Sequence, residues 1–255
     1  MKYMGSKNRI SRYILPIMLA ERKPDQFWVE PFVGGANMID KVDGNRIGRD
    51  SNKYLIALLK EMQISIPFDP PHIGEIEYRN IQKNKSDYPD WLVGYVGFNL
   101  SFAAKFFGGY RRDKVGARDH ENESQQNLRA QQNHLLGIDF RHCDYRELVI
   151  PKNSLIYLDP PYLGTTGYKD KFCHKEFYKW CESKHIEGHT IFLSEYSAPQ
   201  EFELIFEKTV SSNLDVASKG KKQTEKLFIY KGRKITSTTT SPQNDLRLTM
   251  TETDA

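Results

Sequence analysis

The sequence has 255 residues, of which 38% are hydrophobic and 27% charged, and its formal net charge is +4 at pH 7. This length and balance suit one globular catalytic domain with room for a small inserted lobe, and they exclude an intrinsically disordered chain. Three cysteines cannot frame a disulfide scaffold, and no apolar run approaches the roughly 20 residues of a membrane helix, so we expect a cytoplasmic protein that contacts no membrane.

The first fifty residues contain a basic start and two apolar runs that end in turns. Lys2 to Lys7 alone indicates a flexible basic segment. Phe27 to Glu30 predicts a buried strand that leads into Pro31-Phe32-Val33-Gly34-Gly35, where glycines allow a backbone to approach a ligand closely. Asn45 to Gly48 predicts a second strand that leads to Asp50, the place of a carboxylate that holds ribose hydroxyls.

This spacing alone does not separate a dinucleotide from S-adenosylmethionine as the ligand. A complete G-x-G-x-x-G pattern is absent from the glycine turn, which disfavours the dinucleotide.

The middle of the chain has a different pattern. Lys53 to Gln63 has apolar residues at helical spacing and predicts a helix. From 64 to 137 strand-like patterning is scarce, while aromatic residues, a basic stretch and a Gln/Asn-rich run follow one another. We therefore expect an inserted, mainly helical lobe over 64–137, with 1–63 and 138–255 forming the catalytic domain.

Positive charge is concentrated in two stretches. Lys105 to Arg118 has five cations and one acid, and Lys219 to Lys234 has seven cations and one acid, so the rest of the chain is net acidic. Two basic patches on an acidic body suggest a polyanionic partner, although solvated loops would give the same pattern. The candidate contacts to such a partner are Lys105, Arg111, Arg112, Lys114 and Arg118.

Further apolar runs continue the alternation of strands and helices. Ile138 to Phe140 predicts a third strand before Asp144, an acid that either accepts from an adenine amino group or belongs to an ordinary turn. Thr190 to Leu193 and Leu227 to Tyr230 read as two more buried strands, and Thr236 to Ala255 as a weakly ordered tail. The alternation predicts a doubly wound α/β sheet.

The sharpest motif is Asp159-Pro160-Pro161-Tyr162, directly after the apolar run Ser154 to Leu158. Two prolines make a stiff turn that holds a carboxylate and a nearby carbonyl at the strand's carboxyl end. Two acceptors without a donor suit an exocyclic amino group, and the adjacent tyrosine ring can stack on a planar base. The alternative is a tight loop after a core strand.

In this order the motifs resemble the Dam-like N6-adenine DNA methyltransferases, with the alpha-type motif order. Lys2 to Lys7, which includes Tyr3, resembles the family's N-terminal cofactor segment, and Glu30 to Gly35 resembles its glycine loop. Asp50 and Asp144 fall where the family holds the cofactor's ribose and adenine. Asp159 to Tyr162 resembles the catalytic tetrapeptide, and the region between Asp50 and Asp144 corresponds to the target-recognition lobe.

The resemblance also shows departures. Tyr3 stands where the family often has Trp, and the loop reads Gly-Gly-Ala instead of Gly-Ala-Gly. No contact residue for a target sequence carries over from the recognition lobe.

The resemblance implies a Rossmann-like methyltransferase sheet. It also implies a role in restriction-modification or a related process, in a prokaryotic or phage-infected cell. Asp159 and the Pro160 carbonyl would accept hydrogen bonds from the two amino N–H groups of an adenine that is flipped out of duplex DNA, and Tyr162 would stack on the base. S-adenosylmethionine would supply the methyl group, with no metal required. Tyr3, Lys7, Glu30, Pro31, Phe32, Gly34, Gly35, Asp50, Asp144 and Asp159 would hold this cofactor, with Asp159, Pro160, Pro161 and Tyr162 at the reaction centre.

Other interpretations stay open at this point. Alternatives are methylation of cytosine N4 in DNA, of adenine in RNA or of a protein amide, because the tetrapeptide has cousins in other amino-methyltransferases. Asp159 leans towards adenine only by resemblance, and the two basic stretches argue against a protein amide. A silent DNA-binding relative would keep the fold without turnover. A nicotinamide dehydrogenase on a similar sheet is disfavoured because no hydride-transfer site is recognisable.

Overall fold

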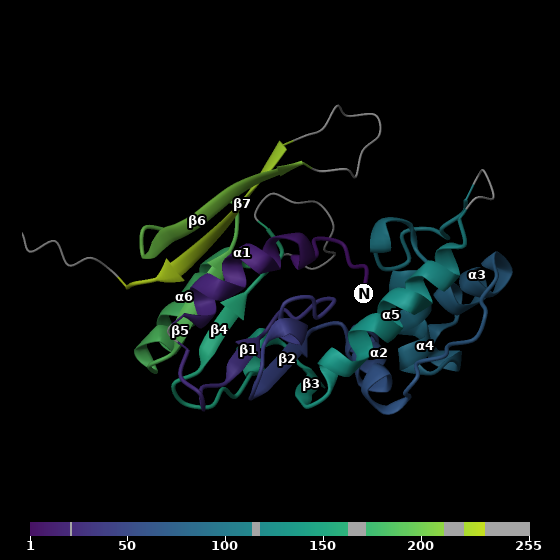
Figure 1. Ribbon diagram of the computed structural model, residues 1–255, viewed down its shortest axis with the longest axis horizontal. Helices are drawn as coiled ribbons and strands as arrows, with labels where there is room; N and C mark the ends of the chain where they lie inside the picture. The colour runs from purple at the N-terminus through teal and green to yellow at the C-terminus, as the bar shows by residue number, and fades with distance from the viewer. Residues whose placement is uncertain (21, 114–117, 163–171, 212–221, 233–255) are drawn as a thin grey trace, which may run out of the picture.

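One mixed sheet organises the computed structural model (Figure 1), which describes residues 1–20, 22–113, 118–162, 172–211 and 222–232. The strand order is β3-β2-β1-β4-β5-β7-β6. Neighbours among β1 to β5 are parallel, and β7 is antiparallel to both β5 and β6. The strands are β1 (Trp28–Glu30), β2 (Arg46–Asp50), β3 (Ile138–His142), β4 (Leu155–Leu158), β5 (Thr190–Ser194), β6 (Phe202–Ser211) and β7 (Lys222–Tyr230).

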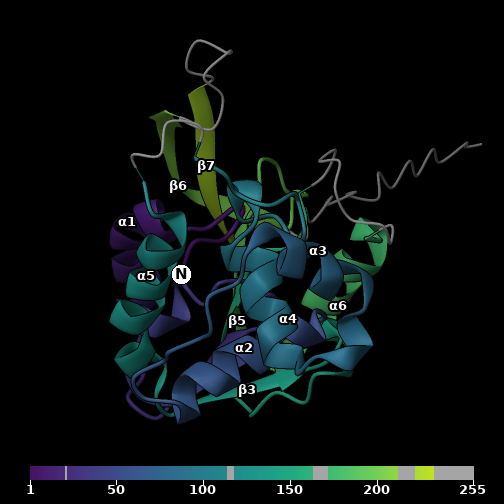
Figure 2. The ribbon, with the colours of Figure 1, turned by 90° about the vertical axis from the view of Figure 1, so that its right-hand side faces the viewer.

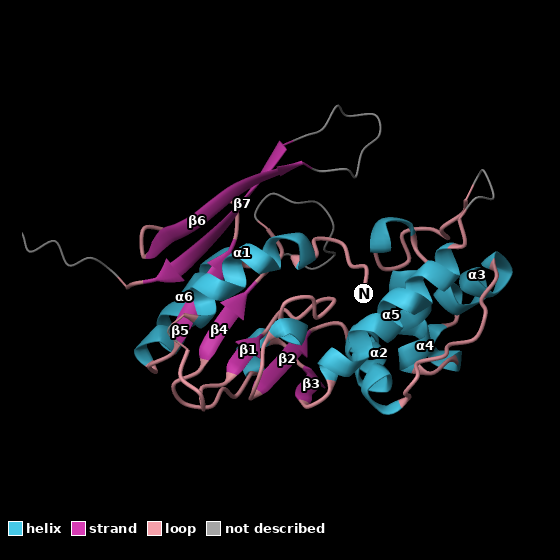
Figure 3. Cartoon of the chain, in the orientation of Figure 1, coloured by secondary structure: helices cyan, strands magenta, loops and turns pink. Residues whose placement is uncertain are grey.

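Helices cover the sheet and fill the connection between β2 and β3 (Figures 1 and 3). They are α1 (Asn8–Leu19), α2 (Lys53–Ile64), α3 (Glu75–Lys83), α4 (Asp90–Gly94), α5 (His120–Leu135) and α6 (His174–Ile186). Short 3₁₀ turns occur at Ile39–Lys41, Lys85–Asp87, Phe102–Ala104 and Tyr145–Glu147, and a π turn at Tyr95–Asn99. The predicted α/β class is confirmed as a seven-stranded mixed sheet.

The central strands are buried on both faces. Every residue of β1 and β4 is buried, as expected for parallel strands between two layers. Alternate residues of β4 face opposite sides, since Leu155 and Tyr157 join one core cluster and Ile156 and Leu158 join the other. Continuous apolar runs in the sequence, without a strict polar alternation, follow from this double burial.

The parallel register brings the ends of several strands to one edge of the sheet. Glu30 pairs with Gly48, and β4 lies on the other side of β1. The loops that follow β1, β2 and β4 therefore leave the sheet at the same edge, the one where open α/β sheets bind ligands. The glycine loop, Asp50 and Asp159 all lie here.

The described residues between β2 and β3 are helical or looped and contain no strand (Figures 2 and 3). They share a core with the sheet. The buried cluster that contains Trp28 of β1 also contains Leu58 of α2, Leu128 of α5 and Tyr95, which follows α4. The division into a catalytic domain and an inserted lobe over 64–137 stays a prediction.

Two elements were not anticipated from the sequence. Helix α1 contains Pro16, a residue that argues against a helix interior, yet it buries Ile10, Ile14, Leu15 and Met18 against the sheet. Strand β6 carries charged residues among its apolar ones and forms a long antiparallel ladder with β7. The predicted tail at 236–255 lies outside the described residues. In the part of the chain that the structure describes, no helix is long and apolar enough to cross a membrane.

Helices α2 and α4 meet closely at a glycine, which gives a test of the packing. A methyl group on Gly94 would lie 2.1 Å from the Tyr54 carbonyl oxygen, so the two backbones must separate in Gly94→Ala. We expect this change to lower the free energy of unfolding by about 1–3 kcal/mol in urea titrations. Gly74→Ala is the control, because no heavy atom lies within 4 Å of its added methyl group. The control should change stability by no more than about 0.5 kcal/mol, and equal effects of the two substitutions would contradict the close contact.

Candidate active site

The glycine loop after β1 is tied to the acid at the end of β2. The Gly34 backbone N–H donates to Asp50 Oδ2 over 3.1 Å, and the Asn52 N–H donates to Asp50 Oδ1 over 2.9 Å. Burial of the carboxylate raises the pKa of Asp50 to about 6, although these two hydrogen bonds act in the opposite direction. Asn52 also caps α2, so the acid sits between the loop and a helix start.

Tyr3 lies directly on this loop. A methyl group on Gly34 would be 2.9 Å from Tyr3 Cε1, and one on Gly35 would be 2.7 Å from Tyr3 Cβ. Gly34 also has a φ of +49°, a conformation that favours glycine. The Tyr3 ring centroid is 5.5 Å from that of Phe98. The predicted N-terminal segment and glycine loop are therefore in contact, with the helical segment beside them.

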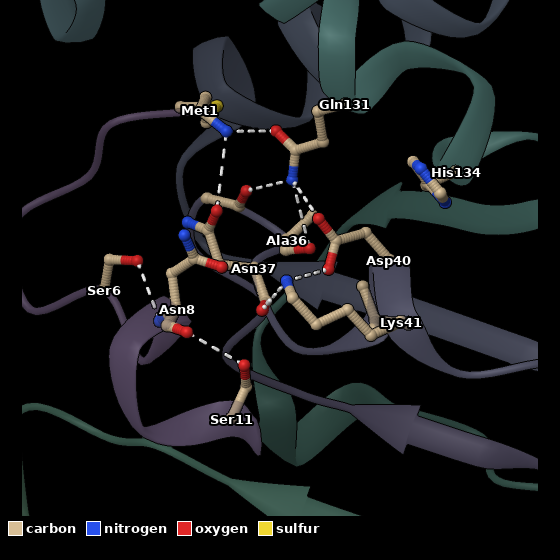
Figure 4. Close-up of polar contacts among 12 residues, drawn as sticks. Met1, Ser6, Asn8, Ser11, Ala36, Asn37, Asp40, Lys41, Gln131 and His134 are labelled. Atoms are coloured by element: carbon tan, nitrogen blue, oxygen red, sulfur yellow. Dashed lines mark hydrogen bonds and ion pairs between the residues drawn. The ribbon is translucent and has the colours of Figure 1, made fainter. Parts of the chain in front are cut away.

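Gln131 of α5 holds the same loop from the helical side (Figure 4). Its buried side-chain amide donates to the carbonyls of Gly35 (3.1 Å) and Ala36 (3.2 Å) and to Asp40 Oδ2 (2.8 Å). Sequence reasoning missed this residue, because it stands in a Gln/Asn-rich run and approaches the loop from 95 residues along the chain. A glutamine on a buried helix face was the one available signal.

Lys7 and Asp159 form a buried ion pair at the end of β4. Lys7 Nζ lies 2.9 Å from Asp159 Oδ1 and 3.8 Å from Glu225 Oε2 of β7, and the Lys7 side chain is only 7% exposed. Burial acts to lower the pKa of Lys7, but the two carboxylates outweigh it and the pKa is raised. The same ammonium lies 4.7 Å from the centroid of the Tyr162 ring. The tetrapeptide and the N-terminal segment thus form one centre.

The surroundings of this centre are aromatic and polar. Tyr162 makes an edge contact with Tyr196, with ring centroids 4.6 Å apart. Tyr157 and Ser194 share a hydrogen bond of 2.8 Å beneath it. Pro160 is buried, and its ring restricts the backbone φ in the turn that follows the strand.

Glu30 and Asp144 have partners within the protein. Glu30 is buried and accepts from Trp28 Nε1 over 2.7 Å, and burial raises its pKa well above the ordinary range. Asp144 accepts from the Arg146 side chain through both oxygens at 2.8 Å, and these hydrogen bonds lower its pKa. Asp144 therefore presents its carboxylate to an arginine, and Glu30 supports the strand.

Phe32 connects the glycine loop to the end of β3. Its ring centroid lies 5.3 Å from that of Tyr145, next to Asp144. It also makes an edge contact with Phe177 of α6 at 5.8 Å. Phe32 is thus placed by its ring contacts with Tyr145 and Phe177.

Two arginines of the first basic stretch, Arg111 and Arg112, are paired with acids. Arg112 forms a two-pronged ion pair with Glu75, with one hydrogen bond of 2.7 Å, and Arg111 lies 3.6 Å from Glu123. The backbone N–H of Arg118 donates to Asp113 Oδ2 over 2.6 Å. Lys105 is exposed, and Lys114 lies outside the described residues. The five residues stay predicted DNA contacts.

A parallel-stranded edge with a glycine loop and two acids is the arrangement of nucleoside-binding α/β proteins. The model of the D12 class N6 adenine-specific DNA methyltransferase family matches residues 93–218 of the chain. This match includes Asp144 and Asp159 to Tyr162, and it confirms the resemblance at the level of the family. Asp50 and the glycine loop lie outside it.

Two individual proteins are similar to the chain. Over 199 residues it is 25% identical to the Type II methyltransferase M.FokI of Planomicrobium okeanokoites, an alignment that covers 67% of this chain and 30% of that protein. The chain thus spans less than a third of that relative. A crystal structure of SMU.472 complexed with SAH covers 90% of this chain and 53% of its own, at 12% identity and a TM-score of 0.39.

The Gln131 contact predicts a measurable stabilisation. Gln131→Leu keeps the side-chain size but leaves the Gly35 and Ala36 carbonyls without this donor. We expect a loss of about 1–3 kcal/mol in the free energy of unfolding, measured by urea titration. The control is Gln126→Leu on the exposed side of the same helix, which should stay within about 0.5 kcal/mol. Equal stabilities of the two variants would rule out the inferred support of the loop.

The raised pKa of Asp50 predicts a pH dependence. Because the folded protein binds this proton with a pKa of about 6, against 3.8 ordinarily, protonation favours folding. Ionised Asp50 therefore lowers the free energy of unfolding, and this destabilisation should be complete above about pH 6. It should disappear as the pH falls from about 6 to about 4. The measurement is the difference in unfolding free energy between wild type and Asp50→Asn across this range. A difference that is independent of pH would contradict the assignment.

Proposed function

We propose that this protein transfers a methyl group from S-adenosylmethionine to the N6 atom of an adenine flipped out of duplex DNA. The match to the family model supports the reaction class, and the observation that carries the proposal is the position of Asp159 at the ligand-binding edge, paired with Lys7 at 2.9 Å. The DNA sequence that the protein recognises would be set by residues of the helical segment between β2 and β3. The proposed role of the protein is therefore the methylation of DNA at specific sites.

The residues at the edge fit the cofactor. The Asp50 carboxylate, held by backbone N–H groups at 2.9 and 3.1 Å, is an acceptor suited to two ribose hydroxyls. Gly34 and Gly35 would let the backbone of the loop approach the cofactor closely, and Tyr3 and Phe32 offer aromatic surface beside them. Asp144 would have to share its carboxylate with Arg146 to accept from an adenine amino group. Bound S-adenosylmethionine would supply the electrophilic methyl group.

The chain's own groups would prepare the target nitrogen. The Asp159 carboxylate and the Pro160 carbonyl accept hydrogen bonds from the two N–H groups of the adenine amino group. These hydrogen bonds favour a pyramidal and more nucleophilic nitrogen, and they stabilise the positive charge that develops on it. Lys7 holds the carboxylate at the strand end through the ion pair. Tyr162 stacks on the extruded base and recovers part of the roughly few kcal/mol that flipping costs.

The helical segment between β2 and β3 is the proposed target-recognition lobe. It contacts the glycine loop through Gln131, and its Phe98 lies against Tyr3, which covers the loop. Lys105, Arg111, Arg112, Lys114 and Arg118 would contact phosphates or base edges. Arg111 and Arg112 would then exchange their present partners, Glu123 and Glu75, for DNA.

The proposal is tested by substitution of the catalytic carboxylate. Asp159→Asn keeps the shape but loses the charge, and we expect methyl transfer to duplex DNA to fall by at least about 100-fold. The assay uses labelled S-adenosylmethionine, followed by nucleoside digestion and mass spectrometry, with N6-methyladenine as the expected product. Binding of S-adenosylmethionine, measured by calorimetry, should be retained, because Asp50 and the glycine loop are unchanged.

Loss of Asp159 also leaves the buried Lys7 ammonium without its closest partner, which can destabilise the fold. The double variant Lys7→Met with Asp159→Asn removes both charges and separates folding from chemistry. It should fold and remain inactive. Wild-type turnover in either variant, or N4-methylcytosine as the product, would refute the proposal.

A further inference from the structure

Two cations meet around one tyrosine on the outer side of α1. The Tyr13 ring stacks on Phe206 of β6, with centroids 6.4 Å apart and planes 20° from parallel. Lys208 Nζ lies 3.9 Å from the centroid of the same ring, and Arg12 Nη2 donates to the Tyr13 hydroxyl over 2.8 Å. We call Arg12, Tyr13 and Lys208 the α1–β6 cluster.

The cluster has no acidic counterpart among the described residues. Neither Arg12 nor Lys208 forms an ion pair there, and the exposed Arg9, one turn earlier on α1, forms none either. Glu225, the register partner of Lys208 across the β6–β7 ladder, lies 3.8 Å from Lys7. Hydrogen bonding by Lys208, and then by Arg12, lowers the pKa of Tyr13, as expected in a positive environment.

This environment contrasts with the first basic stretch. There Arg112 is held by Glu75 and Arg111 lies near Glu123, so an incoming anion must displace a carboxylate. At the α1–β6 cluster a guanidinium, an ammonium and a phenol hydroxyl are available together. Arg, Lys and Tyr side chains are among the groups that contact phosphate oxygens in complexes with DNA.

The cluster is close to the proposed reaction centre along the chain. Lys7, which contacts Asp159, directly precedes α1, and Arg12 and Tyr13 follow five and six residues later. At 1.5 Å per residue this is about 8–9 Å along the helix axis. Phosphates of one DNA strand are spaced by about 3.4 Å along the duplex, so the separation corresponds to two or three nucleotides. Figure 1 shows the β6–β7 hairpin running over α1 on this side.

We propose that the α1–β6 cluster binds a backbone phosphate of the DNA strand that flanks the extruded base, toward the β6 edge of the sheet, which is opposite to the β3 edge. This inference rests on the proposed function and adds a second contact surface to it. The duplex would be held from two sides of Asp159. One side is the segment between β2 and β3, and the other is α1 with β6.

The test measures the salt dependence of DNA binding, for which the recognition sequence need not be known. Fluorescence anisotropy of a mixed-sequence duplex of about 30 base pairs gives the dissociation constant between 50 and 200 mM salt. The slope of log K against log salt reflects the number of phosphates neutralised, at about 0.9 for each. Arg12→Ala with Lys208→Ala should weaken binding and reduce the size of this slope by about 1.

The matched control is Lys60→Ala with Lys179→Ala, which removes two exposed cations from α2 and α6. This control should keep the wild-type slope. Both double variants should retain S-adenosylmethionine affinity, measured by calorimetry, because none of the four residues lies at the ligand edge. A second arm adds inorganic phosphate at constant ionic strength, and separates a DNA contact from a site for a small anion.

Each outcome has a definite meaning. An unchanged slope in Arg12→Ala with Lys208→Ala, while the wild type binds DNA and transfers methyl groups, overturns the cluster and leaves the proposed function standing. If the variant loses sensitivity to inorganic phosphate but keeps wild-type DNA binding, the cluster is a small-anion site and the inference fails. A wild-type protein that neither binds duplex DNA nor methylates it overturns both.

Discussion

The ion pair between Lys7 and Asp159 is the constraint on which the rest of the site depends. A nearly buried ammonium needs a close carboxylate, because an uncompensated charge away from water is costly. The pair joins the segment before α1 to the end of β4, and Glu225 brings β7 to the same ammonium. Three distant parts of the chain are therefore held at one point. The same carboxylate is the proposed acceptor for the target amino group.

The ligand edge is also supported from the helical segment. Gln131 holds the backbone of the glycine loop, Tyr3 covers Gly34 and Gly35, and Phe98 lies beside Tyr3. Asp50 is fixed by N–H groups from the loop and from the start of α2. The proposed cofactor site and the proposed target-recognition lobe therefore share contacts directly, and a substitution on α5 acts on the loop without touching a ligand.

Local patterns predicted the parts of this structure that depend on local chemistry. Apolar runs ending in Asp50 and Asp159 predicted strands whose carboxyl ends meet at one edge, and the spacing of Lys53 to Gln63 predicted α2. Helix α1 was missed because Pro16 argues against it, although tertiary burial of Ile14 and Met18 outweighs that preference. The roles of Gln131 and Glu225, and the pairing of Arg112 with Glu75, are long-range contacts that no local pattern encodes.

The continuous core beneath the helical segment limits how specificity can be redesigned. Leu58, Tyr95 and Leu128 pack into the same cluster as Trp28 of the central strand. A wholesale exchange of this segment with that of a related protein would carry half of an interior interface into a foreign sheet, where its shapes would not match. Grafting exposed side chains onto the existing helices avoids this mismatch, so engineering of the target sequence is better begun at the surface than at the segment's boundaries.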